Sequence, residues 1–302
     1  MPGDVVEMLS RTEAQTRGID LEDARKIVIN MINYDPDEPI IRQMSRYYGA
    51  LLRGNLGTSM FSRTLTVNEI IAETLPWTMF VLSISLIVSF SIGTKLGSLM
   101  AWKRTSFINQ IVSIYSIITT AIPNFIFGIL LILVFCVALN WFPISGAYSP
   151  HLKPAFTLEF ILDIFYHAAL PMLTYILTTV GGWALQMKGV AINVLGEDYV
   201  MAARARGIPD GLMMKRYVKK NAMLPMVTSL ALSFGGMVGG STLIESTFSY
   251  PGMGAFLAQA VAQRDYTMMQ GMLLVTSFAI IVANLIADFI YAKLDPRVRL
   301  GD

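Results

Sequence analysis

The sequence is poor in charge, histidine and cysteine. Charged residues make up 15% of the 302-residue chain and hydrophobic residues 54%, whereas a soluble domain carries about 25% charge. There are two histidines, His151 and His167, and the one cysteine, Cys136, lies inside a long apolar run. This composition excludes an ordinary soluble domain, and the lone cysteine says nothing about disulfides or redox compartment.

Sequence motifs of nucleotide and metal chemistry are also missing. The chain has no GxxxxGK[ST] phosphate loop, no HExxH and no CxxC, so it cannot hydrolyse ATP by a phosphate-loop mechanism. The sequence contains no cluster of acids, bases, nucleophiles or metal ligands, and we expect no catalytic residue and no metal site. Its basic residues lie beside apolar segments, where membrane topology explains them, so we expect no nucleic-acid partner.

Long apolar runs dominate what is present. A helix needs about 20 mostly apolar residues to cross the hydrocarbon core of a bilayer, and five segments satisfy this requirement. They are residues 75–101, 110–142, 168–187, 222–244 and 271–292. Each run is continuous rather than alternating, which favours helices over barrel strands. The sequence therefore predicts an all-α polytopic membrane protein with five visible spanning helices.

The distribution of lysine and arginine predicts the orientation of these spans. Basic residues cluster after the first span, between the third and fourth, and in the tail, whereas residues 143–167 and 245–270 contain only Lys153 and Arg264. By the positive-inside rule the basic connections and the C-terminal tail, residues 293–302, are cytoplasmic. We therefore expect a multi-pass protein of the cell membrane, in contact with lipid, with residues 245–270 forming an outer loop.

Five spans and a cytoplasmic C-terminus place the N-terminal segment, residues 1–74, outside the cell. That segment has no signal peptide, and its most apolar stretch, residues 27–32, is too short to insert. We expect that a first spanning helix is missing from this sequence; the alternative is that the first visible span inserts in reverse. The predicted organisation is an extracytoplasmic segment followed by a transmembrane domain over residues 75–292 and the tail.

A polar, basic stretch from residue 196 to residue 225 separates the third and fourth spans. Small residues lead into a glycine and a proline, in the order Ala202, Ala203, Ala205, Gly207 and Pro209. Glycine suits the left-handed residue just past a helix end, and proline suits the first turn of the next helix. The pattern predicts a helix, a break and a second helix, which together form a surface for another protein. We call residues 196–221 the coupling region.

Glu245 is the acidic residue that most invites a functional interpretation. It stands at the outer end of the fourth span and follows four glycines, Gly235, Gly236, Gly239 and Gly240. Ionisable groups at membrane depth are costly and often functional. The glycines serve either close helix packing or bending of a moving pathway, and the sequence leaves both interpretations open.

Five segments carry a resemblance to a known family. Residues 199–207, YVMAARARG, resemble the cytoplasmic signature Glu-Ala-Ala-x-x-x-Gly with Met201 in place of the glutamate, and residues 220–225, KNAMLP, resemble its Arg-Asn-Ala-x-x-Pro ending. Residues 245–254, ESTFSYPGMG, with RDY at 264–266, resemble ETxFSxPGxG and RDY; the head resembles PGDP at residues 2–4 and LLRGDLGxS at residues 51–59. The chain thus resembles membrane-spanning permease subunits of ABC importers, specifically the dipeptide and oligopeptide branch.

The resemblance implies a type I ABC importer permease fold with six spans, the first of which is not in this sequence. It implies a non-catalytic subunit that forms half of a peptide pathway and holds no cofactor, while ATP and Mg bind to its partners. Those partners are a second homologous permease subunit, two cytoplasmic ATPase subunits and an extracytoplasmic substrate-binding protein. Residues 19–31 match no segment of the family, so the resemblance gives no shape for that part of the head.

Two groups of candidate site residues follow. ATPase coupling is assigned to Tyr199, Ala202, Ala203, Arg204, Ala205, Arg206, Gly207, Pro209 and Asp210. A pathway or outer gate is assigned to Gly235, Gly236, Gly239, Gly240, Glu245, Arg264 and Asp265.

Two alternatives remain. The cargo of such a permease can also be a nickel chelate or an oligosaccharide. A secondary transporter driven by an ion gradient is the competing class, but it would usually carry ionisable groups near the membrane midplane and paired broken helices in repeated halves. The sequence shows no convincing midplane carboxylate and no obvious internal repeat.

Overall fold

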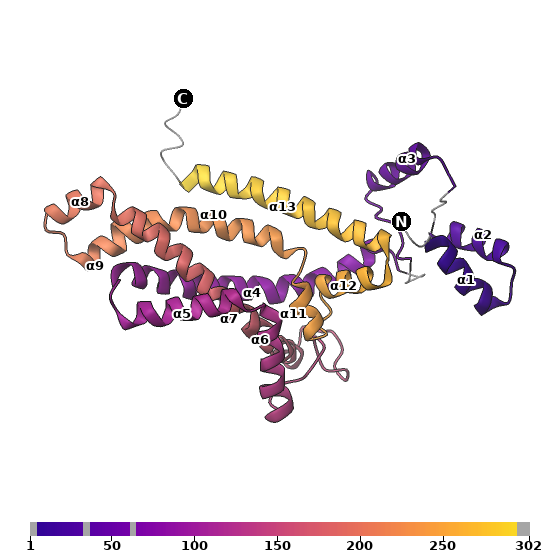
Figure 1. Ribbon diagram of the computed structural model, residues 1–302, viewed down its shortest axis with the longest axis horizontal. Coiled ribbons are helices and arrows are strands. Elements are labelled where there is room, and N and C mark those ends of the chain that lie inside the picture. The colour runs from indigo at the N-terminus through magenta and orange to yellow at the C-terminus, as the bar shows by residue number, and fades with distance from the viewer. Residues whose placement is uncertain (1–4, 33–36, 61–64, 295–302) are drawn as a thin grey trace. The chain divides into compact units, whose positions relative to one another are not determined.

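The computed structural model describes residues 5–32, 37–60 and 65–294, and it is built from helices joined by loops (Figure 1). Among these residues, the β-structure is one isolated antiparallel bridge between Thr58 and Thr66. The chain divides into two compact units, one of residues 1–75 with 256–275 and the other of residues 76–255 with 276–302. The predicted all-α class is confirmed.

The first unit contains a helical hairpin. Helices α1 (Val5–Arg17) and α2 (Leu21–Ile32) are joined through Gly18, whose φ of 65° is the left-handed conformation that glycine adopts without strain. Their small apolar core consists of Val6, Leu9, Val28 and Met60, with Ile29 packed against it. A third helix, α3 (Ile40–Leu51), follows in the same unit.

Within the described residues, three helices are long and apolar enough to cross a membrane. They are α4 (Val67–Trp102), α7 (Leu158–Leu195) and α13 (Tyr266–Leu294), the last over Tyr266–Ala287. Helix α4 contains the predicted span 75–101, α7 contains 168–187, and the membrane-capable part of α13 contains most of 271–292. Helices α4 and α7 begin eight and ten residues earlier than the predicted spans. With 36 and 38 residues, each is roughly 55 Å long at 1.5 Å per residue, so both extend well beyond a bilayer core of about 30 Å.

The segment predicted as one span over residues 110–142 is bent. Helix α5 (Phe107–Ala121) is followed by α6 (Asn124–Leu131) and the π-helical turns of η1 (Ile132–Ala138), with a 99° bend between the two parts. Pro123 explains the break, because proline disfavours the helical conformation in the residue before it. Ile122 accordingly has extended angles, φ −96° and ψ 127°. Counting this bent pair as one span gives up to four spans in the described chain.

The segment predicted as the span 222–244 is also interrupted. Helix α10 (Lys219–Met237) ends before a turn at Gly240, whose φ is 74°, and a short helix α11 (Thr242–Thr247) follows. By the same criterion of length and hydropathy, α10 is not among the span candidates. The expected continuous helix is therefore corrected: the glycine run at 235–240 contains the end of α10 and a left-handed turn at Gly240, which apolar composition does not reveal. Helix α12 (Met253–Gln263) completes this part of the chain.

Glycine permits the closest helix contact in the second unit. A Cβ added to Gly97 of α4 would overlap the Ala184 carbonyl oxygen and lie 2.7 Å from Met187 Cβ of α7. Gly93, one turn earlier, would likewise overlap Trp183. Small residues four apart allow two membrane helices to bring their backbones together. This contact joins the core shared by α4, α7 and α10, which includes Leu86, Met187 and Met226.

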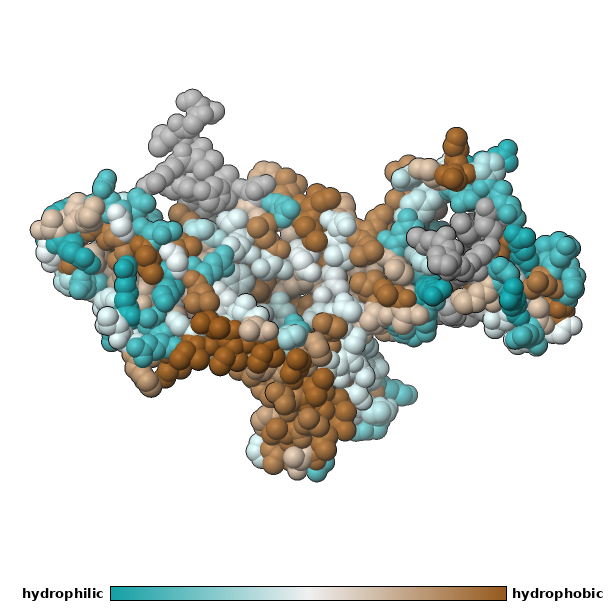
Figure 2. Space-filling view, viewed as in Figure 1, coloured by the Kyte–Doolittle hydropathy of each residue, from teal (hydrophilic) through white to brown (hydrophobic). Residues whose placement is uncertain are grey.

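Exposed apolar residues cover α5 and α6. Isoleucines along one face of α5 are exposed, including Ile114 at 59% and Ile117 at 64%. The space-filling view shows a continuous hydrophobic surface over these two helices (Figure 2). Such a surface is expected where a protein contacts lipid rather than water.

Candidate functional site

The coupling region forms the predicted helix, break and helix. Helix α8 (Asp198–Ala205) ends at Gly207, and α9 (Asp210–Met213) begins directly after Pro209. Gly207 has φ 73°. Its N–H donates to Arg204 O at 2.9 Å, and the N–H of Ile208 donates to Ala203 O at 3.2 Å. This pair of bonds is a Schellman cap, in which the left-handed residue is usually glycine.

One face of the coupling region is buried. Val200 and Ala203 of α8 are 1% and 4% exposed, and Met213, Met214 and Val218 are also buried. Met214 and Val218 belong to η2 (Met214–Val218), a π-helical stretch that continues from α9 into α10. Except for Ala203, these side chains belong to the same apolar core as Met187 and Ala191 of α7. The coupling region is thus packed onto the ends of two long helices rather than tethered as a loop.

The opposite face is exposed. Seven of the nine residues predicted to couple to an ATPase are exposed: Ala202, Arg204, Ala205, Arg206, Gly207, Pro209 and Asp210. Tyr199 is half-buried, and Ala203 faces the core, so Ala203 contributes packing rather than exposed surface. Met201 and Leu212, which are not among the predicted coupling residues, are 55% and 40% exposed and add apolar area to this face. The α8 and α9 tip is shown at the left of Figure 1.

Glu245 is buried and accepts four hydrogen bonds. Its residue exposure is 3%. Oε1 accepts from Thr78 Oγ1 at 2.9 Å and from Ser241 N at 3.3 Å, while Oε2 accepts from Gly254 N at 2.8 Å and from Ala255 N at 3.1 Å. Gly254 and Ala255 lie in the first turn of α12, where unpaired N–H groups and the helix dipole favour an anion. The carboxylate therefore joins α4, α11 and α12.

The tight geometry around Glu245 accounts for nearby glycines. A Cβ at Gly252 would collide with the Glu245 carboxylate and lie 2.7 Å from Thr78 Oγ1. A Cβ at Gly254 would lie 2.7 Å from Thr242 N and 3.0 Å from Glu245 Oε2. In the sequence these two glycines stand out only as part of a family motif. Thr78 is not predicted as a site residue, because 167 residues separate it from Glu245.

Burial shifts the pKa values of Glu245 and of the nearby Tyr250. Burial raises the pKa of Glu245 above the ordinary carboxyl value, and the hydrogen bonds from Thr78 and the three backbone N–H groups oppose that rise. Tyr250 is 1% exposed, and burial followed by the charge of Glu245 raises the pKa of its hydroxyl. Among the residues that the structure describes, the Tyr250 hydroxyl has no hydrogen-bond partner.

The four predicted pathway glycines have different roles. Gly235 and Gly239 face α13, where a Cβ at Gly235 would overlap Ala283 and one at Gly239 would lie 2.9 Å from Thr276 Cγ2. Gly236 has open space around it, and Gly240 occupies the left-handed turn beside Glu245. Close packing therefore explains Gly235 and Gly239, and backbone conformation explains Gly240.

Arg264 and Asp265 lie in the first unit, at the start of α13. Arg264 is exposed and has φ 59°. Asp265 is 1% exposed; it accepts a hydrogen bond of 2.5 Å from Ser59 Oγ and one of 3.0 Å from Met268 N. The second bond makes Asp265 the N-cap of α13. Among the described residues, no three His, Cys, Asp or Glu side chains are grouped as metal ligands.

Comparison with known proteins identifies the family. The profile of the family described as "Binding-protein-dependent transport system inner membrane component" matches residues 93–300. The chain belongs to this family. The match includes the coupling region and Glu245 with its backbone donors, whereas Thr78 lies before the matched residues.

Curated relatives match the permease over most of its length. The oligopeptide transport system permease protein AppB of Bacillus subtilis is 32% identical over 88% of this chain and 82% of the relative. A putative peptide permease protein of Brucella suis is 34% identical over 87% of this chain and 81% of the relative. The glutathione transport system permease protein GsiC of Escherichia coli K12 is 30% identical over 99% and 90%, respectively.

A solved structure supports the fold. The permease matches a chain of the inward-facing MetNI methionine ABC transporter with a TM-score of 0.58 and 15% identity, covering 75% of this chain and 96% of that one. At this identity the match concerns fold alone. The permease is therefore an all-α, multi-pass membrane protein with the fold of an ABC importer permease subunit.

Proposed function

We propose that this permease forms half of the peptide pathway of an ATP-driven importer and receives its driving force at the α8–α9 face of the coupling region. The observation that carries this proposal is the two-sided packing of that region. Its inner side is part of the core around α7, and its outer side is exposed, basic and free of long side chains at Ala202, Ala205 and Gly207.

The exposed face has the chemistry of a helix that enters a groove. Short side chains allow close backbone approach, and Met201 and Leu212 supply apolar contact area. Arg204 and Arg206 can pair with acidic residues at the rim of a partner, which favours association and fixes its orientation. We propose that an ATPase subunit provides this groove, with Tyr199 supporting the face from its half-buried position.

Core packing provides a route for the coupling. Because Val200, Met213 and Val218 pack in the core that contains α7 residues, displacement of the coupling region moves the ends of α7 and α10 with it. Packed helices switch between discrete arrangements rather than deform continuously. We propose that closure of two ATPase subunits on ATP and Mg, and their reopening after hydrolysis, shifts the spans between outward-open and inward-open packings.

The remaining partners and the orientation follow the same scheme. A second homologous permease supplies the other half of the pathway, and a substrate-binding protein delivers cargo outside the cell. We propose that the coupling region and residues 293–302 are cytoplasmic, and that residues 1–74 and 245–270 are extracytoplasmic. Thiol labelling with a membrane-impermeant reagent tests this: in intact cells Gly18→Cys reacts and Ala205→Cys does not, whereas the reverse pattern contradicts the orientation.

We propose that the Glu245 cluster acts at the outer gate of the pathway. Glu245 holds the turn at Gly240 and the start of α12 against α4, so release of the carboxylate frees three elements together. Gly236, which has open space around it, allows α10 to move beside α13. Arg264, which is exposed, belongs to the outer surface that we propose for docking of the binding protein, and the buried Asp265 caps the start of α13 next to it.

Peptides are the proposed cargo because relatives that match most of the chain are named as peptide, oligopeptide or glutathione permeases. Nickel chelates and oligosaccharides are the alternatives within the same transport class. Uptake by proteoliposomes that contain the permease with its partner subunits tests class and cargo together. We expect uptake of labelled peptide that requires ATP and is competed by unlabelled peptide. Uptake driven by an ion gradient without ATP would instead establish a secondary transporter.

A further inference from the structure

Helix α3 exposes its apolar side chains. None of the residues in this helix is buried. Five apolar side chains at or next to it are exposed: Ile40 at 72%, Ile41 at 82%, Met44 at 49%, Tyr48 at 52% and Leu52 at 89%. In the space-filling view, brown side chains project from the α3 region of a largely teal N-terminal segment (Figure 2).

These apolar residues share one side of the helix. With 3.6 residues per turn, their positions fall within an arc of about 120°, and Arg42, Arg46 and Arg53 fall on the opposite side. A helix of this length is only marginally stable in water without a packed face. The apolar arc of α3 therefore needs a covering surface that the described residues of its own compact unit do not supply.

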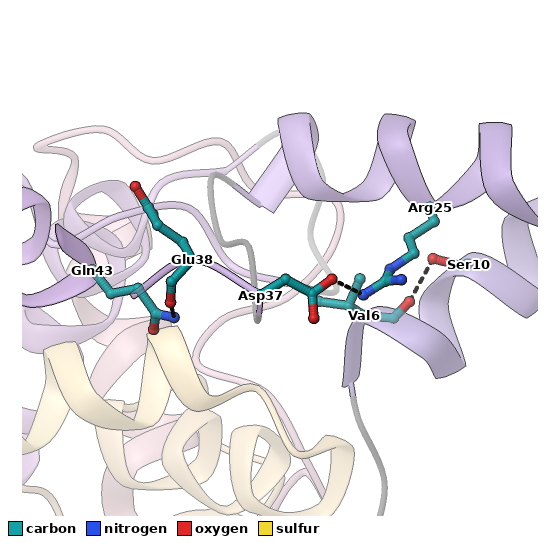
Figure 3. Close-up of polar contacts among 6 residues, drawn as sticks. All are labelled: Val6, Ser10, Arg25, Asp37, Glu38 and Gln43. Atoms are coloured by element: carbon teal, nitrogen blue, oxygen red, sulfur yellow. Dashed lines mark hydrogen bonds and ion pairs between the residues drawn. The ribbon is translucent and has the colours of Figure 1, made fainter. Parts of the chain in front are cut away.

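Polar contacts fix the start of α3 without covering that arc. Gln43 Nε2 donates a hydrogen bond of 2.7 Å to the Glu38 carbonyl oxygen, and the Glu38 carboxylate pairs with Arg46. Asp37, just before the helix, pairs with Arg25 of α2 at 2.6 Å (Figure 3). The two acidic residues at the beginning of α3 are thus each paired with an arginine.

The charge and position of α3 favour a lipid surface as the covering partner. From residue 39 to residue 68 the sequence contains no aspartate or glutamate, while it contains Arg42, Arg46, Arg53 and Arg63. Arginine forms strong hydrogen bonds with phosphate oxygens. The same segment leads into α4, which is long and apolar enough to span the membrane, so α3 is connected to the bilayer by about 15 residues.

We propose that α3 lies flat in the lipid–water interface. Ile40, Ile41, Met44, Tyr48 and Leu52 insert among the upper acyl chains, and Arg42, Arg46 and Arg53 remain at the level of the phosphodiester headgroups. Amphipathic helices with a wide apolar arc and a basic polar face bind membranes in this way. The proposal depends on neither the cargo nor the leaflet, because both leaflets present phosphates and acyl chains.

Site-directed spin labelling of the full-length permease in phosphatidylcholine–phosphatidylglycerol nanodiscs tests the proposal. Met44→Cys places a nitroxide at the centre of the apolar arc, and Gly49→Cys places one about 140° away on the same helix. An added side chain at Gly49 meets no atom within 4 Å, which makes it a matched control. Both variants are prepared in a Cys136→Ser background, because Cys136 is the only native thiol.

We expect the Met44 label to be several-fold more accessible to oxygen, which concentrates in lipid, than to a water-soluble nickel chelate. The Gly49 label should show the opposite preference. Equal accessibility at the two positions, or the reverse pattern, would overturn the proposal. Shielding of the Met44 label from both reagents, appearing only when a soluble binding protein is added, would also overturn it by identifying a protein partner. Labelling Tyr48→Cys repeats the measurement at an independent position.

Discussion

Thr78 Oγ1 donates a hydrogen bond of 2.9 Å to Glu245 Oε1 and accepts one of 2.8 Å from Met253 N. A single threonine of α4 thereby fixes both the buried carboxylate of α11 and the first residue of α12. The three elements meet within the second compact unit. The proposed outer gate is therefore a hydrogen-bonded unit, and the contribution of each donor to the stability of the folded protein can be measured.

Thr78→Val should destabilise the permease. The valine removes a donor to Glu245 and an acceptor for Met253 N, and leaving a buried polar group without a partner costs about 1–3 kcal/mol. Thr74→Val is the matched control, because Thr74 is also buried on α4 and bonds only to Ile70 O of its own helix. Thermal unfolding in detergent should show a clearly lower melting temperature for Thr78→Val and little change in melting temperature for Thr74→Val. Equal losses would contradict the gate assignment.

Glu245→Gln should change the pH dependence of stability. Because burial raises the folded-state pKa of Glu245, the folded protein retains a proton that the unfolded chain has released. Stability linked to this group is therefore greatest below the ordinary carboxyl pKa and falls as the pH rises through the folded-state pKa. Glutamine does not titrate, so the melting temperature of the wild type should fall relative to that of the variant as the pH rises through the folded-state pKa of Glu245. A wild-type melting temperature that rises relative to the variant would mean that hydrogen bonding to the carboxylate outweighs burial.

Tyr250→Phe should preserve or increase stability. The Tyr250 hydroxyl is buried without a hydrogen-bond partner among the described residues, so its removal relieves a desolvation cost. Phenylalanine retains the ring, which makes an edge contact with Trp77 at 6.3 Å between ring centroids. Unfolding measured alongside Tyr250→Leu, which loses that contact, separates the two contributions. A large loss in the phenylalanine variant would show that the hydroxyl is bound by a group outside the described residues.

Gly207→Val should uncouple transport from ATP hydrolysis while leaving membrane insertion intact. Only glycine adopts φ 73° at low cost, and other residues there cost about 1–2 kcal/mol and disturb the Schellman cap. Gly18→Val is a control with comparable backbone strain, since Gly18 has φ 65° and lies in the α1–α2 hairpin. ATPase stimulation in reconstituted complexes should fall for Gly207→Val only. Normal stimulation by that variant would show that the coupling region is not the transmission element.

The sequence predicted local features well where local chemistry decides them. Gly207 and Pro209 located the break between α8 and α9, because cap geometry depends on residues within one turn. The apolar runs located α4, α7 and α13, because hydropathy and length determine which segments can cross a bilayer. The resemblance to ABC importer permeases, based on short motifs, is confirmed by the family match over residues 93–300.

Apolar composition concealed the interruptions in two other runs. Residues 110–142 read as one span, yet Pro123 bends the helix by 99°. Residues 222–244 also read as one span, yet α10 ends at Met237 and a left-handed turn at Gly240 interrupts the helix. Hydropathy averages over a window and does not detect a single residue with special backbone preferences.

The sequence by itself determined the class of the protein, its membrane character and the position of the break between α8 and α9, because each depends on composition or on residues close together in the chain. Tertiary structure alone showed that Ala203 faces the core while its neighbours are exposed, that Gly235 and Gly239 pack against α13, and that Thr78 meets Glu245. The physical reason is that these features depend on contacts between segments that are distant in the sequence. Those contacts decide which side chains are buried and which atoms they meet.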